Sequence, residues 1–317
     1  MRTGTVFATA QCTPPQFFPD NLHQQRAVGV GAGVMRVHHL NCGTNCPFGG
    51  RLIDGVSTGA KGTLVCHCLL LETDRDGLVL VDTGYGLRDV RSPHEHQHPR
   101  VSRFMRGLLN IQLREEETAL RQVERLGFQA SDVRHIILTH LDFDHAGGLD
   151  DFPEASIHLM DAEFRAASGP RRGPVSRNRY RPAQWHDVDQ WHCYPTTGER
   201  WLGFEAVRDL TGLPPEILIV PLPGHTWGHA GVAVDLGSRW LLHAGDAYFY
   251  RGEVRGAQRE CTPGLRAYQT LMEVHRESRL RNQQRLRSLS IARRSDVNVF
   301  CAHDRVEFER ARAGRPL

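Results

Sequence analysis

The sequence predicts a mixed α/β protein in which short buried strands alternate with amphipathic helices. Short apolar runs bounded by turn-forming residues recur along the 317 residues, which is typical of strands. Other segments carry apolar residues at helical spacing, with charged residues on the opposite face. In addition, several predicted strands end in an Asp or a His, which is the arrangement expected if one edge of the scaffold carries one site.

The strands are predicted from apolar runs and turn signals. Residues 63–71 form the first run, the pair Asp76-Gly77 marks a turn, and residues 78–81 complete a hairpin. Further strands are predicted at 135–139, 155–160, 216–220, 231–236, 239–242 and 297–301.

The helices are predicted from periodicity and end signals. Residues 99–113 and 114–127 each place apolar residues on one face, and Gly127 is a suitable C-cap. Another helix begins near Gly264 and is followed by a strongly basic stretch over 276–294. We interpret this basic stretch as a solvated helix face rather than a nucleic-acid surface.

Residues 1–34 are rich in Gly, Pro, Gln and Thr without a clear period, so we expect a loose N-terminal extension. Residues 35–317 are expected to form the folded domain. Within it, residues 169–201 combine Gly, Pro and several Arg with three Trp, and we interpret them as a lid-like excursion over the site, because loops of this length inside a compact domain are usually functional.

Charge and hydropathy restrict the class of partner. The net charge is +3 with His neutral, which creates no strong field for nucleic acid or an anionic membrane. No stretch approaches the ~20 apolar residues of a membrane span, and we find no convincing signal peptide. We therefore expect a cytoplasmic protein with reduced thiols that acts on a small molecule, without nucleic-acid or membrane partners. Cys66 and Cys68 alternate in an apolar run and are expected to be buried strand residues.

The stretch Thr139–Leu149, T-H-L-D-F-D-H-A-G-G-L, contains the strongest functional signal. It follows a predicted strand and places two His and two Asp within six residues: His140, Asp142, Asp144 and His145. Imidazole and carboxylate are the ligand types that suit zinc, iron or manganese. Four other strand ends carry the same residue types, at Asp82, His225, Asp246 and His303. The sequence therefore predicts a metal site assembled from several strand ends.

These motifs together resemble the metallo-β-lactamase superfamily of metal-dependent hydrolases. The resemblance rests on the ordered set H-x-[HD]-x-D-H, G-H-T-x-G-H, G-D and a late strand-end His, together with L-V-D-T-G at 80–84, and it runs from about Met35 to His303. It implies a four-layer αββα sandwich with two metal ions in a cleft at one edge of the two sheets. Within the superfamily, the chain looks most similar to the lactonase and glyoxalase II-like hydrolases.

The resemblance also implies a role for each matching residue. It places His140, Asp142 and His225 on the first metal, places Asp144, His145 and His303 on the second, and makes Asp246 the bridge. Asp82 would orient a ligand His by a hydrogen bond, although an Asp after a strand also forms turns. The departure is Asp142, where the common pattern has His. Zinc is the metal that the family implies, but a carboxylate at this position favours iron or manganese relative to three His.

The implied chemistry is attack of a metal-bridging hydroxide on an ester, lactone or thioester carbonyl. Asp144 and Asp246 would hold the nucleophile and move a proton. Either Tyr194 or Tyr248 is expected to donate a hydrogen bond to the developing oxyanion, as a tyrosine does in related lactonases. His186 and His192 are alternatives for substrate contact, whereas His229 would either touch substrate or pack. The alternative function is an iron-dependent oxidoreductase of the same superfamily, similar to the persulfide dioxygenases, which Asp142 would favour.

Overall fold

The computed structural model describes residues 35–92, 99–171, 173–196 and 198–317. The predicted N-terminal extension, residues 1–34, lies outside the described residues. In the part of the chain that is described, no helix is both long enough and apolar enough to cross a membrane.

One sheet has seven strands in the order β4-β1-β2-β3-β5-β6-β7. Strands β1, β2 and β3 are antiparallel neighbours, whereas β3, β5, β6 and β7 run parallel to one another. The strands are β1 (Arg36–Asn45), β2 (Leu64–Glu72), β3 (Leu78–Val81), β4 (Ile111–Gln112), β5 (Val133–Ile137), β6 (Ser156–Met160) and β7 (Trp191–Tyr194).

The second sheet has six strands in the order β13-β12-β11-β10-β9-β8. Its strands are antiparallel except for the pair β12 and β13, which is parallel. They are β8 (Glu199–Trp201), β9 (Phe204–Asp209), β10 (Ile217–Pro221), β11 (Ala230–Asp235), β12 (Trp240–His243) and β13 (Val297–Phe300).

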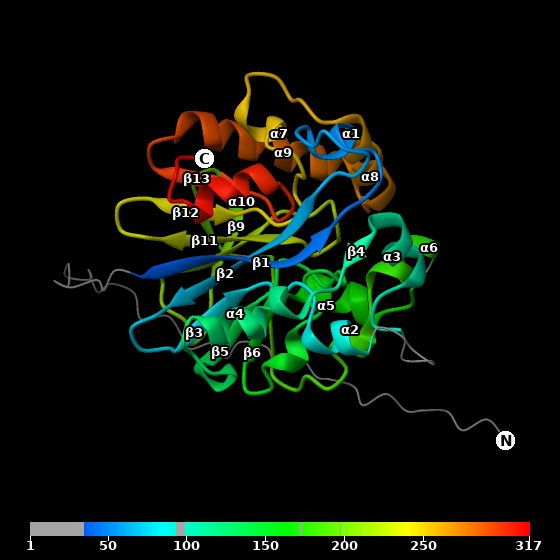
Figure 1. Cartoon of the computed structure of the whole chain (residues 1–317). Coiled ribbons are helices and arrows are strands. Elements are labelled where there is room, and N and C mark those ends of the chain that lie inside the picture. Colours follow the sequence, from blue (N-terminus) through cyan, green and yellow to red (C-terminus); the bar gives the residue numbers. More distant parts are fainter. Residues whose placement is uncertain (1–34, 93–98, 172, 197) are drawn as a thin grey trace.

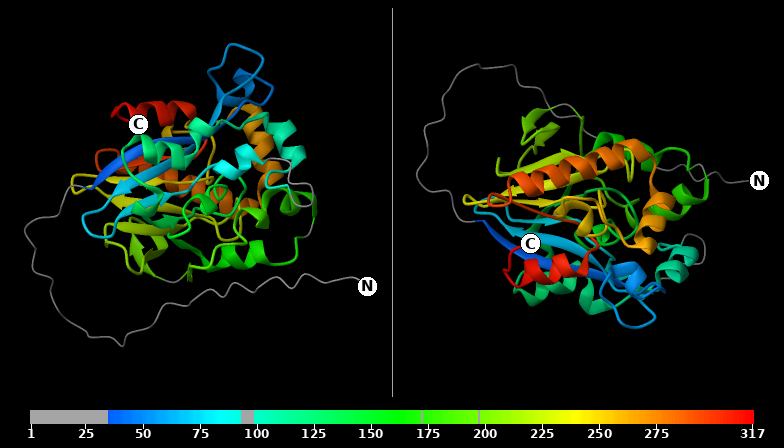
Figure 2. Two further views of the ribbon diagram at one scale, coloured as in Figure 1. Left: turned by 60° about the horizontal axis from the view of Figure 1, so that its bottom comes forward. Right: turned by 90° about the horizontal axis from the view of Figure 1, so that it is seen from above.

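The two sheets face each other across a continuous apolar core, and helices cover their outer faces (Figures 1 and 2). Leu69 and Val81 of the first sheet share this core with Ile219 and Val232 of the second. The predicted four-layer αββα sandwich is therefore confirmed. The helices are α1 (Arg51–Asp54), α2 (Leu87–Arg91), α3 (Arg103–Leu109), α4 (Ala119–Arg125), α5 (Asp161–Ser168), α6 (Gly173–Arg179), α7 (Gly252–Arg255), α8 (Pro263–Met272), α9 (Arg276–Ala292) and α10 (Arg305–Arg312).

Each outer face buries a stripe of apolar residues from its helices. Ala119 and Val123 of α4, with Phe164 of α5, pack against the first sheet. Leu286 and Leu289 of α9 pack against the second sheet. The buried residues of the basic helix α9 include these two leucines and also the polar residues Arg279, Asn282 and Gln283.

The segment 169–201 is not one continuous loop. Its first part forms α6, and its last part supplies β7 at the edge of the first sheet and β8 at the edge of the second. The sequence suggested an irregular excursion because short edge strands have little apolar patterning. Three further strands, β1, β4 and β9, have no counterpart among the predicted strands, and β4 lies where the end of a helix was predicted.

Strand direction explains why the polar strand ends meet. In the first sheet β3 and β5 run parallel, so Asp82 and His140 leave the same edge. In the second sheet β10 and β12 are both antiparallel to β11, and β13 is parallel to β12. The residues that follow these three strands, His225, Asp246 and His303, consequently leave one edge as well.

A pair of isoleucine substitutions tests the core between the sheets. Ile219→Ala, at a fully buried position, should lower the free energy of unfolding by about 2–5 kcal/mol, because transfer and cavity terms add. Ile291→Ala is the matched control, since its side chain is 52% exposed on α9, and it should change stability by about 0.5 kcal/mol or less. Urea denaturation of both variants in the same metal state provides the measurement. Equal losses would contradict the assigned core.

Candidate metal centre

Three donor atoms from three strand-end loops form a compact triangle. Nε2 of His145 lies 3.4 Å from Nε2 of His303, and Oδ1 of Asp246 lies 3.4 Å from the first nitrogen and 3.1 Å from the second. All three side chains are buried. The structure therefore brings together with Asp246 two of the three residues predicted for the second metal, His145 and His303.

A second set of donors surrounds the other oxygen of the same carboxylate. Oδ2 of Asp246 lies 3.3 Å from Nε2 of His225 and 3.7 Å from Nε2 of His140. Oδ2 of Asp142 lies 3.0 Å from His225 Nε2 and 3.6 Å from His140 Nε2. Asp246 thus turns one oxygen toward each set, which is what a bridging carboxylate requires.

The donor spacing fits metal ions. Ligand atoms at Zn–N and Zn–O distances near 2.0–2.1 Å in tetrahedral geometry are separated by roughly 3.3 Å. Buried polar atoms without partners give a second indication, because Nε2 of His140 and Oδ1 of Asp246 accept or donate no hydrogen bond among the described residues. The donors are imidazoles and carboxylates, which suit divalent ions.

Asp144 and Cys66 adjoin the triangle of His145, His303 and Asp246. Oδ2 of Asp144 lies 3.8 Å from Nε2 of His303. The donor atoms of Cys66, Asp144 and His303 all lie within 4.8 Å of one another. Cys66 is buried in β2, as expected from the sequence. Its position near the candidate ligands was not foreseen from the sequence.

Hydrogen bonds fix which ring nitrogen His140 and His145 present. Nδ1 of His145 lies 2.8 Å from Oδ2 of Asp82, which also accepts the Thr139 hydroxyl at 2.8 Å. Nδ1 of His140 lies 2.9 Å from the same hydroxyl oxygen. Because both Nδ1 atoms are engaged on this side, both Nε2 atoms face the donor sets. Asp82 therefore contacts a ligand histidine, in the position expected for it.

The backbone of Asp82 adopts an unusual conformation, with φ of 57°. Asp tolerates this left-handed region better than most residues. Oδ1 of Asp82 also accepts the backbone N–H of Thr139 at 2.8 Å, which ties β3 to the end of β5. Burial opposes ionisation of this carboxyl, but the charge and hydrogen bond of His145 hold its pKa below the usual value. Asp82 is thus an ionised carboxylate in the folded protein.

Glu163 is a positioning residue that sequence reasoning missed. Its buried carboxylate accepts the backbone N–H of Leu141 at 3.0 Å through one oxygen. The other oxygen accepts the Thr226 hydroxyl at 2.6 Å and the Gly228 N–H at 3.1 Å. One side chain therefore joins the two loops that carry His140 and His225. A Cβ atom on Gly228 would lie 2.0 Å from the backbone nitrogen of Glu163, so the glycine of the G-H-T-x-G-H motif permits this approach.

Charge and burial set the ionisation of His140 and Asp142. Burial and the neighbouring His145 lower the pKa of His140 to about 4, so this imidazole is neutral at pH 7. Burial alone would raise the pKa of Asp142, but the charge of Arg179, followed by that of His140, holds it well below the usual value. A neutral imidazole and an ionised carboxylate are the forms that bind a metal.

The two tyrosines expected to face the substrate have other partners. The hydroxyl of Tyr194 lies 2.8 Å from Nδ1 of His158 and accepts the backbone N–H of Thr211. The hydroxyl of Tyr248 donates to the carboxylate of Glu307 at 3.0 Å. Both rings are buried in the core. Their short sequence distance from the motifs was therefore misleading, because neither hydroxyl is directed at the donor sets.

The three histidines proposed for substrate contact also lie elsewhere or have another role. Nε2 of His229 accepts the backbone N–H of Asp246 at 2.8 Å while Nδ1 donates to the carbonyl of Leu222, so His229 packs and positions Asp246. His192 stacks on His158 in the first sheet, with ring centroids 4.9 Å apart.

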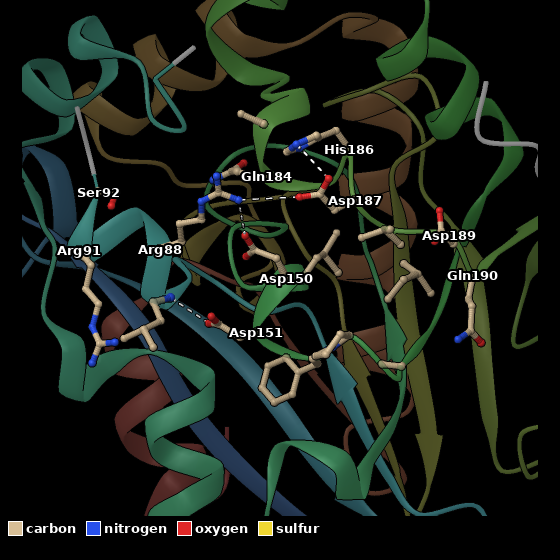
Figure 3. Close-up of a pocket in the computed structure, with 18 residues that line it drawn as sticks. Arg88, Arg91, Ser92, Asp150, Asp151, Gln184, His186, Asp187, Asp189 and Gln190 are labelled. Atoms are coloured by element: carbon tan, nitrogen blue, oxygen red, sulfur yellow. Dashed lines mark hydrogen bonds and ion pairs between the residues drawn. The ribbon is translucent and has the colours of Figure 1, made fainter. Parts of the chain in front are cut away.

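His186 lies in a surface hollow that is separate from the metal centre. It pairs with Asp187 there, close to Arg88 and Asp150 (Figure 3). Of the described residues, those that line this hollow include none of the proposed metal ligands. We therefore correct the expectation that His186 contacts substrate held at the metals.

Tyr268 of α8 is one of three tyrosines near the candidate ligands, together with Tyr85 and Tyr180, and it is the one on which three of their carboxylates act. Burial raises the pKa of its phenol, and the charges of Asp144, Asp246 and Asp142 raise it further. Its ring meets Phe249 edge to face with centroids 5.6 Å apart, and Phe249 in turn stacks on His303. The sequence placed Tyr268 only on an apolar helix face.

Replacing Asp82 tests how the histidine ligands are oriented. Asp82→Asn should weaken zinc binding by roughly 10–100-fold, because the carboxylate that holds Nδ1 of a ligand histidine is lost. Zinc competition against a chromophoric chelator measures the change. Asp235→Asn is a suitable control, since this carboxylate accepts only a local backbone N–H at Gly237 among its described contacts. Unchanged affinity in Asp82→Asn would show that His145 keeps its orientation without this contact.

Comparison with known proteins agrees with this geometry. The family model described as the metallo-beta-lactamase superfamily matches residues 62–288. The probable metallo-hydrolase Rv2300c of Mycobacterium tuberculosis is 43% identical over 280 residues, which are 88% of this chain and 83% of that protein. The N-acyl homoserine lactonase AiiA of Bacillus thuringiensis subsp. kurstaki is 34% identical over 180 residues, covering 57% of this chain and 62% of that protein.

Solved structures show the same fold. An N-acyl homoserine lactone hydrolase with N-hexanoyl-L-homoserine at its catalytic metal centre superimposes with a TM-score of 0.61 at 20% identity, covering 86% of this chain and 94% of its own. AidC, a dizinc quorum-quenching lactonase, superimposes with a TM-score of 0.54 at 16% identity, covering 86% and 89%. Together with the family match, these findings establish that the chain belongs to the metallo-beta-lactamase superfamily and is a metallo-hydrolase.

Proposed function

We propose that this metallo-hydrolase binds two divalent metal ions and hydrolyses an ester or lactone. The observation that carries the proposal is the division of Asp246, whose two oxygens face two separate sets of nitrogen donors 3.1–3.7 Å away. A single metal site would not require donors on both sides of one buried carboxylate. The proposed ligands are His140, Asp142 and His225 for the first ion, Asp144, His145 and His303 for the second, and Asp246 for both.

Two bound divalent ions supply Lewis acidity and lower the pKa of water so that hydroxide forms near neutral pH. The chain's own residues hold the reactants and move protons. Asp246 is fixed from behind by His229, which accepts its backbone N–H. Asp144 is the more exposed of these two carboxylates, at 6%, and we assign it the transfer of a proton to the leaving oxygen. Zinc is the proposed metal, with iron and manganese as alternatives.

Tyr268 is proposed as the donor to the developing oxyanion. It replaces Tyr194 and Tyr248 in this role, because their hydroxyls are engaged with other residues. Its phenol lies close enough to three carboxylates of the donor sets for their charges to act on it. Those charges and its burial keep the hydroxyl protonated, which is the form that can donate a hydrogen bond.

The proposed substrate class rests on chemistry and on similarity. A metal-activated hydroxide suits carbonyls with an oxygen leaving group, such as esters and lactones. Proteins with similar sequences over about half of this chain are named N-acyl homoserine lactonases. The relative with the higher coverage is named a probable metallo-hydrolase, so the proposal is made for the ester and lactone class as a whole.

Metal removal and replacement test the proposal together. Protein purified from its native host should contain two metal ions per chain, and chelation should abolish hydrolysis of a lactone and ester panel, with recovery on adding zinc. His140→Ala and Asp246→Asn should each lower kcat/KM by at least about 10²-fold, because each removes a ligand. His186→Ala should leave activity near the wild-type value, since it lies in the separate hollow.

The same measurements distinguish hydrolysis from the alternative, an iron-dependent oxidation. Bound iron with oxygen consumption and no hydrolysis of esters, lactones or thioesters would overturn the hydrolase and favour the oxidoreductase. Absence of bound metal after native purification, with full activity after chelation, would overturn the metal centre itself.

Matched tyrosine variants test the oxyanion donor. Tyr268→Phe should lower kcat by roughly 10²–10³-fold with unchanged metal content, because a donor to the transition state is lost. Tyr248→Phe removes a hydroxyl that contacts Glu307 instead, so kcat should stay within a few-fold of wild type. The opposite ranking of the two variants would restore the expectation drawn from the sequence.

A further inference from the structure

A buried arginine stands beside the one carboxylate that departs from the family pattern. Arg179 is the last residue of α6, and its side chain is only 1% exposed. Its Nε lies 3.2 Å from Oδ1 of Asp142. Its terminal nitrogens donate to the backbone carbonyls of His225 at 2.8 Å and Met272 at 2.7 Å. Burying a guanidinium is costly unless its charge is matched, so this position requires a nearby anion.

The two oxygens of Asp142 have different surroundings. Oδ2 faces the ligand nitrogens, 3.0 Å from His225 and 3.6 Å from His140. Oδ1 faces Arg179, and neither Oδ1 nor Nε forms a hydrogen bond with any other described residue. The ion pair is therefore the polar interaction that the structure gives to Oδ1 of Asp142 and to Nε of Arg179. It leaves Oδ2 of Asp142 for a metal.

We propose that Arg179 is a positioning residue that fixes Asp142 as a one-oxygen ligand and cancels its charge. The inference rests on the proposed binuclear site. With Asp142 at −1 and Arg179 at +1, the first metal position has the same net charge as three neutral histidines would give it. The carboxylate in the metal motif and the arginine in the segment 169–201 thus form one functional unit, although 37 residues separate them.

A purely structural role is the competing explanation. Arg179 also connects α6 to the His225 loop and to the end of α8, so its loss would disturb packing in any case. The two explanations predict opposite changes in zinc affinity when Arg179 is replaced in a protein whose Asp142 is already a neutral ligand. A terminal nitrogen of Arg179 lies 3.4 Å from Nε2 of His225. Without the charge of Asp142, the Arg179 cation would repel a metal ion bound at His225 and weaken its binding. If Arg179 only anchors the loops, it would still favour metal binding by holding the ligands in place.

The experiment compares zinc affinity in the Asp142→His background. Asp142→His alone is compared with Asp142→His/Arg179→Met and with Asp142→His/Arg179→Gln, a neutral side chain that can still donate to the two carbonyls. Asp142→His/Arg179→Lys keeps the charge without the planar fork. Asp142→His/Arg181→Met is the matched control. Arg181 lies two residues after Arg179 and also donates to backbone carbonyls, those of Pro99 and Arg177. Each protein is titrated with zinc against a chromophoric chelator, and its metal-free melting temperature is recorded.

Charge compensation predicts that removing the arginine charge restores zinc binding. Both neutral double variants should bind zinc at the weaker position at least about tenfold more tightly than Asp142→His. The Lys and Arg181 variants should stay as weak as Asp142→His. The melting temperatures show whether a substitution has disturbed the packing. If Asp142→His/Arg179→Met does not fold, Asp142→His/Arg179→Gln still tests the prediction.

Two results overturn the inference and are distinguishable. If wild type binds two zinc ions but neither neutral double variant binds better than Asp142→His, Arg179 is an anchor and the proposed function stands. If wild type binds no metal, the proposed function fails and this inference fails with it.

Discussion

The carboxylate of Asp246 is the interaction on which the rest of the site depends. It is 3% exposed and lies between four imidazole nitrogens at 3.1–3.7 Å, two for each oxygen. Side chains of this kind are costly to bury without partners. The fold nevertheless holds them together, with buried donor atoms that no other described residue satisfies. In the proposed binuclear site, bound cations recover the free energy lost in burying these groups, which would couple metal binding to the stability of this sheet edge.

Contacts outside the ligand group hold that arrangement in place. Asp82 connects β3 to β5 through the backbone of Thr139 and orients His145. Glu163 connects the loops of His140 and His225. These contacts join both sheets and α5 to the centre, so a substitution in either carboxylate acts on several ligands at once. The rigid sandwich supplies the positions, and the short loops after its strands supply the chemistry.

Local patterns in the sequence were sufficient for most of the scaffold. The hairpin strand predicted at 78–81 is observed as Leu78–Val81, and the strand ends with Asp or His do converge. Strand β1 was missed because its run R-V-H-H-L-N-C-G-T-N contains few apolar residues. It is a strand because its backbone pairs with β2, a long-range contact that periodicity does not encode.

The site was only partly predictable, because several of its residues are defined by long-range contacts that the local sequence does not encode. The proposed metal ligands belong to motifs with fixed spacing, so the sequence could nominate them. Glu163, Tyr268 and Arg179 act through tertiary contacts, and nothing local separates Arg179 from the nearby Arg177 and Arg181. Tyr194 and Tyr248 were nominated by residue type near the motifs, but core packing turns their hydroxyls toward His158 and Glu307.

Crystallographic anomalous scattering at the zinc edge would test the shared carboxylate most directly. The account predicts two peaks per chain, one beside each oxygen of Asp246, with the first also beside Asp142 and the second beside His303. A single peak, or two peaks that do not share Asp246, would contradict the binuclear centre described here.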